Sequence, residues 1–398
     1  MQPVAPKERL PVIDVLRGVA LIGIIVANMR GFNSPMEAYM QPQVMWDTPA
    51  DRLTQACIDC FVSGKFIAIF AALFGIGFAI QMARAGERRD PFARLHVRRM
   101  IGLALLGVAH VLLLWWGDIL LTYAVVGLAL LWFRNSEQSS VMLWGMMLYW
   151  APVFLFLGFT LLSGIGGSSV PAGPEASPEA IQDAIGIYTG TDFGAVLRQR
   201  LADWQVFNAS APVFMPRVLG FFLFGVWIWR EDVLRNLGAW LGRFRRWLPW
   251  LLVAGVSMNA LYVAINHLWT SNPMAPTALN FVMWIAASIG MPALSLFYCL
   301  AVVLLFQSGL GRKLLTPFAL VGRMALTNYL AQSLICTAIF YGWGLGLFGQ
   351  VGPLAGLALA VAVYAAQAGI SAVWLRRFRY GPVEWLWRSM TYGRLQPR

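Results

Sequence analysis

A histidine and an aspartate, His110 and Asp118, stand eight residues apart in the segment Val108-Ala-His-Val-Leu-Leu-Leu-Trp-Trp-Gly-Asp118. Histidine titrates near neutral pH, so His110 is a candidate general base. A single histidine between apolar helices is as often a structural hydrogen-bond partner. Asp118 is a good N-cap for a following helix, and capping alone would explain it. Because eight helical residues span about 12 Å, we expect direct contact only if the helix breaks before Gly117.

Lys65 and Asn28 are further polar residues in apolar segments, where an ionisable group is costly unless it faces a partner or a cavity. Asp59 precedes Lys65 by six residues, which puts the two on different helix faces. Lys65 therefore either reaches the membrane surface or needs an acidic partner or an anionic ligand. Asn28 could join two helices or stabilise a reacting oxyanion. We predict that Lys65, His110 and Asn28 face one water-accessible cavity.

Arginines and amides form another candidate group. Arg17 begins the first apolar segment, where it could serve as a membrane anchor paired with Asp14. In the segment Gly322-Arg-Met-Ala-Leu-Thr-Asn-Tyr-Leu-Ala-Gln-Ser333, Asn328 and Gln332 share a helix face, with Arg323 nearby. This polar stripe should point into the helix bundle, where it binds substrate or joins helices. No spacing of ligand residues predicts a metal site.

The composition defines the class of protein that positions these groups. The chain has 398 residues, of which 59% are hydrophobic and 12% are charged. Soluble domains carry about 25% charged residues. The composition therefore excludes a soluble enzyme, a disordered chain and a disulfide-built secreted module. We expect an all-α polytopic membrane protein.

About ten transmembrane helices are predicted from the apolar segments. They cover approximately residues 12–30, 56–82, 100–116, 119–133, 141–163, 213–229, 248–268, 280–306, 317–340 and 353–375. The connecting segments alternate strictly between rich and poor in Lys and Arg, which predicts that both termini are cytoplasmic. The net charge of +12 then reflects this topology, and no nucleic-acid partner is expected.

The long segment 164–212 divides the chain into two five-span halves, residues 1–163 and 213–398. Its first part is rich in Gly, Ser and Pro and is typical of an irregular linker. Over residues 179–207, apolar side chains recur at helical spacing. This pattern predicts an amphipathic helix that lies on the outer membrane face or caps a cavity.

Four segments and the tail resemble the YeiB-like family of bacterial inner-membrane proteins, over residues 10 to 395. The segments are Ile13-Asp-Val-Leu-Arg-Gly-Val-Ala-Leu-Ile-Gly-Ile with Asn28, Gly64-Lys-Phe with Leu73-Phe-Gly-Ile-Gly-Phe-Ala-Ile-Gln81, Gly107-Val-Ala-His with Trp116-Gly-Asp-Ile-Leu and Tyr123-Ala, Gly322 to Ser333, and Phe378-Arg-Tyr-Gly-Pro-Val-Glu-Trp-Leu-Trp-Arg388. The resemblance implies a multi-pass protein of the bacterial inner membrane, in contact with membrane lipids, and a homodimer.

More distantly, the chain is similar to transmembrane acyltransferases of the heparan-glucosaminide acetyltransferase type. Those enzymes pass an acyl group from cytoplasmic acyl-CoA to an acceptor across the membrane. The likeness rests on Arg17 and on Asn28 near the outer end of the same span. In one branch of these enzymes a His stands where this chain has Asn28, and the loop at 31–54 has no His. His110 is thus the intramembrane histidine that could replace the family's base.

Two functions remain open. The first is acyl transfer from acyl-CoA, as co-substrate, to a lipid or glycan acceptor, with phosphates held by arginines. Its candidate catalytic residues are His110, Asp118, Lys65 and Asn28, and its candidate substrate-binding residues are Arg17, Asp59, Arg98, Arg99, Arg323, Asn328 and Gln332. The alternative is a transporter or lipid-handling protein, in which Lys65, His110, Asp59 and Asp118 form a substrate or proton path.

Overall fold

Helices make up all the regular structure in the part of the chain that the computed structural model describes, which is residues 10–40, 45–87, 92–166, 177–269 and 275–397. Eight helical stretches among these residues are long and apolar enough to cross a membrane. Two shorter apolar segments, Leu120–Phe133 and Ala325–Phe340, correspond to the fourth and ninth predicted spans. The chain is therefore an all-α polytopic membrane protein, as its composition predicts.

The described helices fall into two groups by length. The long ones are α1 (Pro11–Asn33), α4 (Lys65–Glu87), α5 (Phe92–Leu113), α7 (Gln138–Gly166), α10 (Ala211–Arg230), α11 (Leu237–Ala264), α12 (Ala278–Phe306) and α15 (Pro353–Arg377). The shorter ones are α2 (Met36–Met40), α3 (Pro49–Phe61), α6 (Leu120–Ala129), α8 (Pro178–Thr189), α9 (Phe193–Asn208), α13 (Gly309–Arg323), α14 (Ala325–Phe340) and α16 (Pro382–Tyr392).

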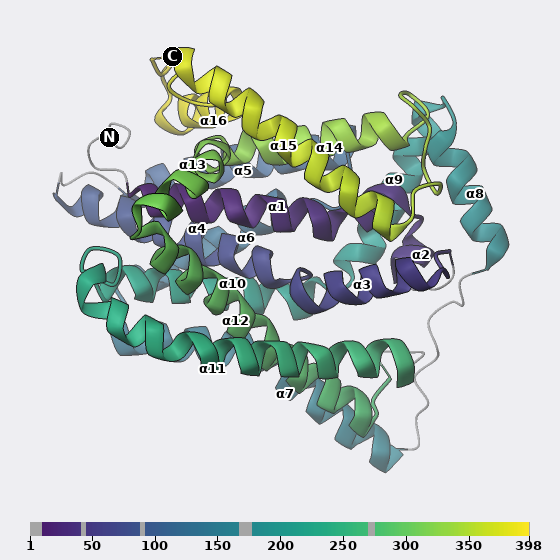
Figure 1. The fold of residues 1–398 in the computed structure, drawn as a ribbon, viewed down its shortest axis with the longest axis horizontal. Coiled ribbons are helices and arrows are strands. Elements are labelled where there is room, and N and C mark those ends of the chain that lie inside the picture. The colour runs from purple at the N-terminus through teal and green to yellow at the C-terminus, as the bar shows by residue number, and fades with distance from the viewer. Residues whose placement is uncertain (1–9, 41–44, 88–91, 167–176, 270–274, 398) are drawn as a thin grey trace.

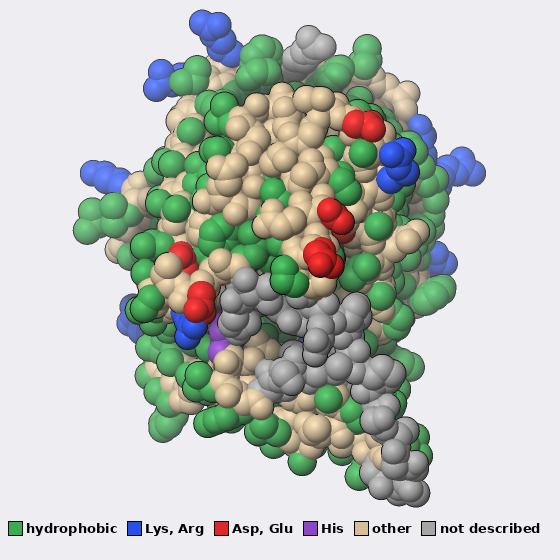
Figure 2. Space-filling model, turned by 90° about the vertical axis from the view of Figure 1, so that its right-hand side faces the viewer, with side chains coloured by type: hydrophobic (Ala, Val, Ile, Leu, Met, Phe, Trp, Pro, Cys, Tyr) green, Lys and Arg blue, Asp and Glu red, His purple; other side chains and the backbone are tan. Residues whose placement is uncertain are grey.

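The two ends of the bundle differ in charge. The start of α1 and helix α16 lie together at the left of Figure 1, which we call the basic end, and α2, α8 and α9 lie at the right, which we call the opposite end. Figure 2 looks onto the opposite end, where Asp and Glu side chains dot the face and most of the visible Lys and Arg side chains lie at its rim. This separation follows the alternation of loop charges in the sequence.

Two predicted helices are each divided in the structure. The predicted span 317–340 consists of the end of α13 and all of α14, because Met324 departs from helical geometry. The amphipathic helix predicted over 179–207 is two helices, α8 and α9. Asp192 begins the second of them by accepting hydrogen bonds from the N–H groups of Gly194 and Ala195.

Helix α1 lies at the centre of the bundle and packs on α4, α13, α14 and α15. Glycines allow its closest approach, to α13. A Cβ atom at Gly322 would lie 1.8 Å from the carbonyl oxygen of Asp14, and one at Gly18 would lie 1.9 Å from that of Phe318. Small residues bring membrane helices this close because lipid supplies no hydrophobic force between them.

Candidate functional site: a cavity between arginines and a buried His–Asp pair

A cavity of about 840 Å³ extends from the basic end of the bundle toward the opposite end. Arginines from five helices and a loop surround its basic end: Arg17, Arg84, Arg99, Arg235, Arg323 and Arg388. Its middle is mainly apolar and aromatic, and includes Phe70, Phe74 and Tyr123. The far end is lined by Asn28, Tyr39, Trp116, Phe207 and Asn208. The cavity is therefore amphiphilic along its length, with cationic groups gathered at one end.

Helix α1 places two of the predicted residues on the same wall. Arg17 and Asn28 are separated by eleven residues, which is three helical turns and about 16 Å along the axis. Both therefore face the cavity, one at each end. Arg17 also pairs with Asp14 at 3.1 Å, as the anchoring interpretation predicts. Its position is therefore compatible both with a membrane anchor and with a ligand contact in the cavity.

His110 and Asp118 are in direct contact. Helix α5 ends at Leu113, the chain turns back before Gly117, and Asp118 Oδ2 lies 2.8 Å from His110 Nδ1. Asp118 Oδ1 accepts a hydrogen bond from the N–H of Leu121 at 2.7 Å, so the same carboxylate also caps α6. Direct contact was expected only if the helix broke before Gly117, and the structure has this break.

Ser333 completes this group from α14. Its Oγ lies 2.8 Å from His110 Nε2, so both ring nitrogens of His110 have partners. Because the carboxylate accepts at Nδ1, the neutral ring carries its proton there and Nε2 accepts from the serine hydroxyl. The order Ser–His–Asp matches the arrangement that orients a base in many hydrolases, but here Ser333 is fully buried.

The His–Asp pair lies behind the cavity wall and not on its surface. Asp118 and Tyr329 belong to the wall, whereas His110 and Ser333 do not, and the side chains of His110 and Asp118 have no exposed area. The ring of Tyr329 lies 5.4 Å from that of His110. A substrate group would therefore reach the pair through the wall formed by Asp118 and Tyr329.

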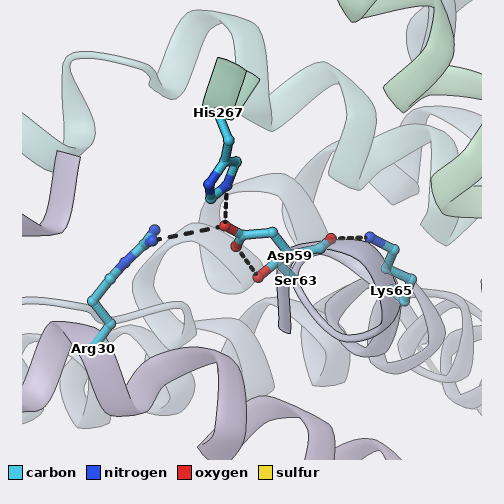
Figure 3. Close-up of polar contacts among 5 residues, drawn as sticks. All are labelled: Arg30, Asp59, Ser63, Lys65 and His267. Carbon is cyan, nitrogen blue, oxygen red and sulfur yellow. Dashed lines mark hydrogen bonds and ion pairs between the residues drawn. The ribbon is translucent and has the colours of Figure 1, made fainter. Parts of the chain in front are cut away.

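Lys65 is absent from the cavity wall and belongs to a second polar cluster, shown in Figure 3. Its Nζ donates to the backbone oxygen of Asp59 at 2.7 Å, and Lys65 is 2% exposed. The Asp59 carboxylate instead accepts from Ser63 and contacts His267 Nε2 at 3.1 Å and Arg30 at 3.9 Å. Of the three residues predicted to share one cavity, Asn28 lines it, His110 lies behind its wall and Lys65 lies elsewhere.

A turn explains why Lys65 reaches Asp59 although the two were expected on different faces. Helix α3 ends at Phe61, and Gly64 takes a left-handed conformation (φ +81°) before α4 begins. The last carbonyl oxygens of a helix lack partners within it. Lys65 satisfies one of them, so neither the surface position nor an acidic side chain is needed.

The remaining predicted residues divide between the cavity and the helix packing. Arg99 and Arg323 line the cavity, and Arg98 is exposed outside it. Asn328 donates to Ser371 Oγ and Gln332 donates to Gln367 Oε1, each at 3.1 Å. These amides join α14 to α15, which supports the structural alternative for the polar stripe.

Glu384 of α16 is a cavity residue that the sequence did not indicate. Its carboxylate accepts hydrogen bonds from the backbone N–H groups of Leu326 and Thr327 and so caps α14 from another helix. Burial raises the pKa of Glu384, although the bonds from Thr327 and Leu326 oppose that shift. A single acid within the basic tail was the signal that could have pointed to it.

Comparison with known proteins places the chain in a family. A family model described as "Protein of unknown function (DUF418)" matches residues 228–394. The chain is 34% identical to "Uncharacterized protein YxaH" of Bacillus subtilis (strain 168), covering 100% of this chain and 98% of that protein. It is 35% identical to "Uncharacterized protein YeiB" of Escherichia coli (strain K12), covering 96% of each. By these full-length matches the chain belongs to the YeiB-like family of membrane proteins.

Proposed function

We propose that this protein transfers an acyl group from acyl-CoA, bound at the basic end, to an acceptor that reaches the far end of the cavity. The observation that carries this proposal is the cavity itself, which joins six arginines to the wall in front of the His110–Asp118 pair. A ligand with an anionic head and a long uncharged arm matches that distribution of charge.

The basic end suits the nucleotide part of such a donor. Phosphates form charge-assisted, often bidentate hydrogen bonds with arginine. The pantetheine arm would then lie along Phe70, Phe74 and Tyr123 and present its thioester near Asn28. In this orientation the basic end faces the cytoplasm, the source of acyl-CoA, in agreement with the positive-inside rule.

The far end supplies the groups that acyl transfer requires. The Asn28 amide, which has no hydrogen-bond partner among the described residues, would donate to the thioester oxyanion. The acceptor's hydroxyl or amine attacks the carbonyl carbon and gives its proton to the Asp118–His110 pair. The carbon–sulfur bond breaks, and the CoA thiolate leaves and takes up a proton.

Isothermal titration of the purified, monodisperse protein with acetyl-CoA tests the first step. We expect binding that Arg17→Ala weakens and that Arg243→Ala, an exposed arginine outside the cavity, leaves unchanged. Absence of binding at millimolar acetyl-CoA would overturn the proposal. It would favour transport, the second candidate, because the same cavity reaches from the start of α1 to the end of α9.

A further inference from the structure

Helix α10 carries an arginine within its membrane-spanning part, away from the cavity. Arg217 lies six residues after Ala211, about 9 Å from that end of the helix. Its guanidinium lies over the rings of Tyr149 and Trp284, at 5.5 and 5.3 Å from their centroids. One terminal nitrogen donates to Ser288 Oγ at 2.6 Å. Among the described residues no carboxylate pairs with Arg217, and its buried Nε has no hydrogen-bond partner.

A proline in α12 frees a backbone oxygen next to Arg217 for a hydrogen bond from another helix. Pro292 has no N–H, so the backbone oxygen of Ser288, four residues earlier, receives no bond from it within the helix. The Tyr149 hydroxyl donates to that oxygen at 2.8 Å. This bond holds Tyr149 against Ser288, and both residues contact the guanidinium. The polar groups around Arg217 are therefore preorganised by three helices, α7, α10 and α12.

No acidic side chain in the described part of the chain compensates the charge of Arg217. Ionised side chains inside a membrane normally pair with an opposite charge or face water, because burial of the charge is costly. Aromatic faces and a hydroxyl stabilise a guanidinium only in part. The guanidinium is only partly buried, so an acceptor group can approach its accessible side. An anion is the ligand chemistry that would neutralise this position.

We infer that Arg217, with Ser288 and the Tyr149 and Trp284 rings, binds the phosphate group of an anionic lipid from the membrane half next to the opposite end. Lipid chains can reach the site because neighbouring side chains on α7 and α12, Phe154, Val282 and Ile289, are exposed apolar groups. Phosphate suits arginine because its oxygens match the planar guanidinium donors. This site is separate from the cavity and does not depend on the proposed function.

Native mass spectrometry and thermal unfolding of the delipidated full chain, with added phosphatidylglycerol or phosphatidylcholine, test the inference. We expect phosphatidylglycerol to bind with higher affinity and to raise Tm more than phosphatidylcholine does. Arg217→Gln should weaken phosphatidylglycerol binding about 10- to 100-fold, as loss of a charged hydrogen-bond partner does. Arg243→Gln is the matched control, because it removes an exposed arginine at the basic end, and it should retain the affinity.

A second variant and a second ligand complete the test. Ser288→Ala keeps the charge and removes the hydroxyl that orients it, so it should weaken binding about 2- to 10-fold and is available if Arg217→Gln does not fold. Inorganic phosphate that protects the wild type as well as phosphatidylglycerol does, but not Arg217→Gln, would assign the site to a free anion and overturn the lipid inference. Equal phosphatidylglycerol affinity in the wild type and in the folded variants at Arg217 or Ser288 would refute it altogether.

Discussion

Asp118 Oδ2 lies 2.8 Å from His110 Nδ1 while Oδ1 of the same carboxylate caps helix α6. One side chain thereby fixes both the orientation of the histidine ring and the position of the next helix. If the proposed acyl transfer holds, Asp118→Asn should leave acetyl-CoA affinity unchanged, because the Asp118 carboxylate bonds to His110 and to the N–H of Leu121, whereas the proposed phosphate contacts are arginines. Transfer should slow by about 10²- to 10⁴-fold, the usual effect of losing a base. Single-turnover transfer alongside titration measures both, and an unchanged rate would remove the pair from the mechanism.

Gly107 permits the contact between α5 and Asp118. A Cβ atom there would lie 2.6 Å from the backbone nitrogen of Leu121 and 2.9 Å from Asp118 Oδ1. Gly107→Ala should therefore displace α6 and lower the free energy of unfolding by about 1–3 kcal/mol, the range for an overpacked core. Gly158→Ala on α7 is the matched control, since no atom lies within 4 Å of its added Cβ. Equal Tm values for the two variants would disprove the steric argument.

Asp203 on α9 should make stability depend on pH. Burial raises the pKa of this carboxyl to about 6, and the charge of Glu37 adds to the shift, while hydrogen bonds from Tyr188 and Gln199 lower it. A carboxyl whose pKa is raised by folding stabilises the folded state at pH values below its unfolded pKa of about 4. This stabilisation is lost as the pH rises through the folded pKa of about 6. The free energy of unfolding should therefore fall by at most about 3 kcal/mol as the pH rises through this range.

The Asp203→Asn variant isolates that contribution. The amide keeps the shape of the side chain and cannot ionise, so the variant should lose less stability than the wild type between pH 4 and 7.5. Thermal unfolding of both proteins across this range is the measurement. Parallel pH profiles would show that Asp203 titrates normally in the folded protein.

Glu384 provides the cap of α14 from 58 residues further along the chain. Glu384→Gln removes the charge that the N–H groups of Leu326 and Thr327 share, and should destabilise the protein by about 1–3 kcal/mol. Glu137→Gln, outside the cavity, is the comparison and should change Tm little. If both variants unfold at the same temperature, the cap contributes nothing measurable.

The sequence predicted the helical class and the approximate spans because lipid requires every backbone group to be paired within a helix. It also predicted that Arg17, Asn28, Arg99 and Arg323 could serve one site, and they line one cavity. Periodicity along a helix could not predict partners from distant segments. Ser333 meets His110 across 223 residues, and this pairing depends on tertiary packing alone.

Lys65 shows a second limit of prediction from the sequence, which is the position of a turn. A straight helix through residues 56–82 would have placed Lys65 and Asp59 on different faces. The left-handed turn at Gly64 brings the ammonium group back to the carbonyl oxygen of Asp59. Glycine in an apolar segment signals such a turn only weakly, because it is equally common where helices pack closely.

The cap that Glu384 places on α14 also has a consequence for biosynthesis. Residues 382–392 leave the ribosome after all ten apolar segments, yet Glu384 and Arg388 belong to the wall of the cavity. Membrane insertion of those segments can therefore precede closure of the basic end. A nascent chain halted before Pro382 would hold its spans in the bilayer with the start of α14 uncapped and the arginine cluster incomplete. Ligand binding would then begin only once translation has passed this helix.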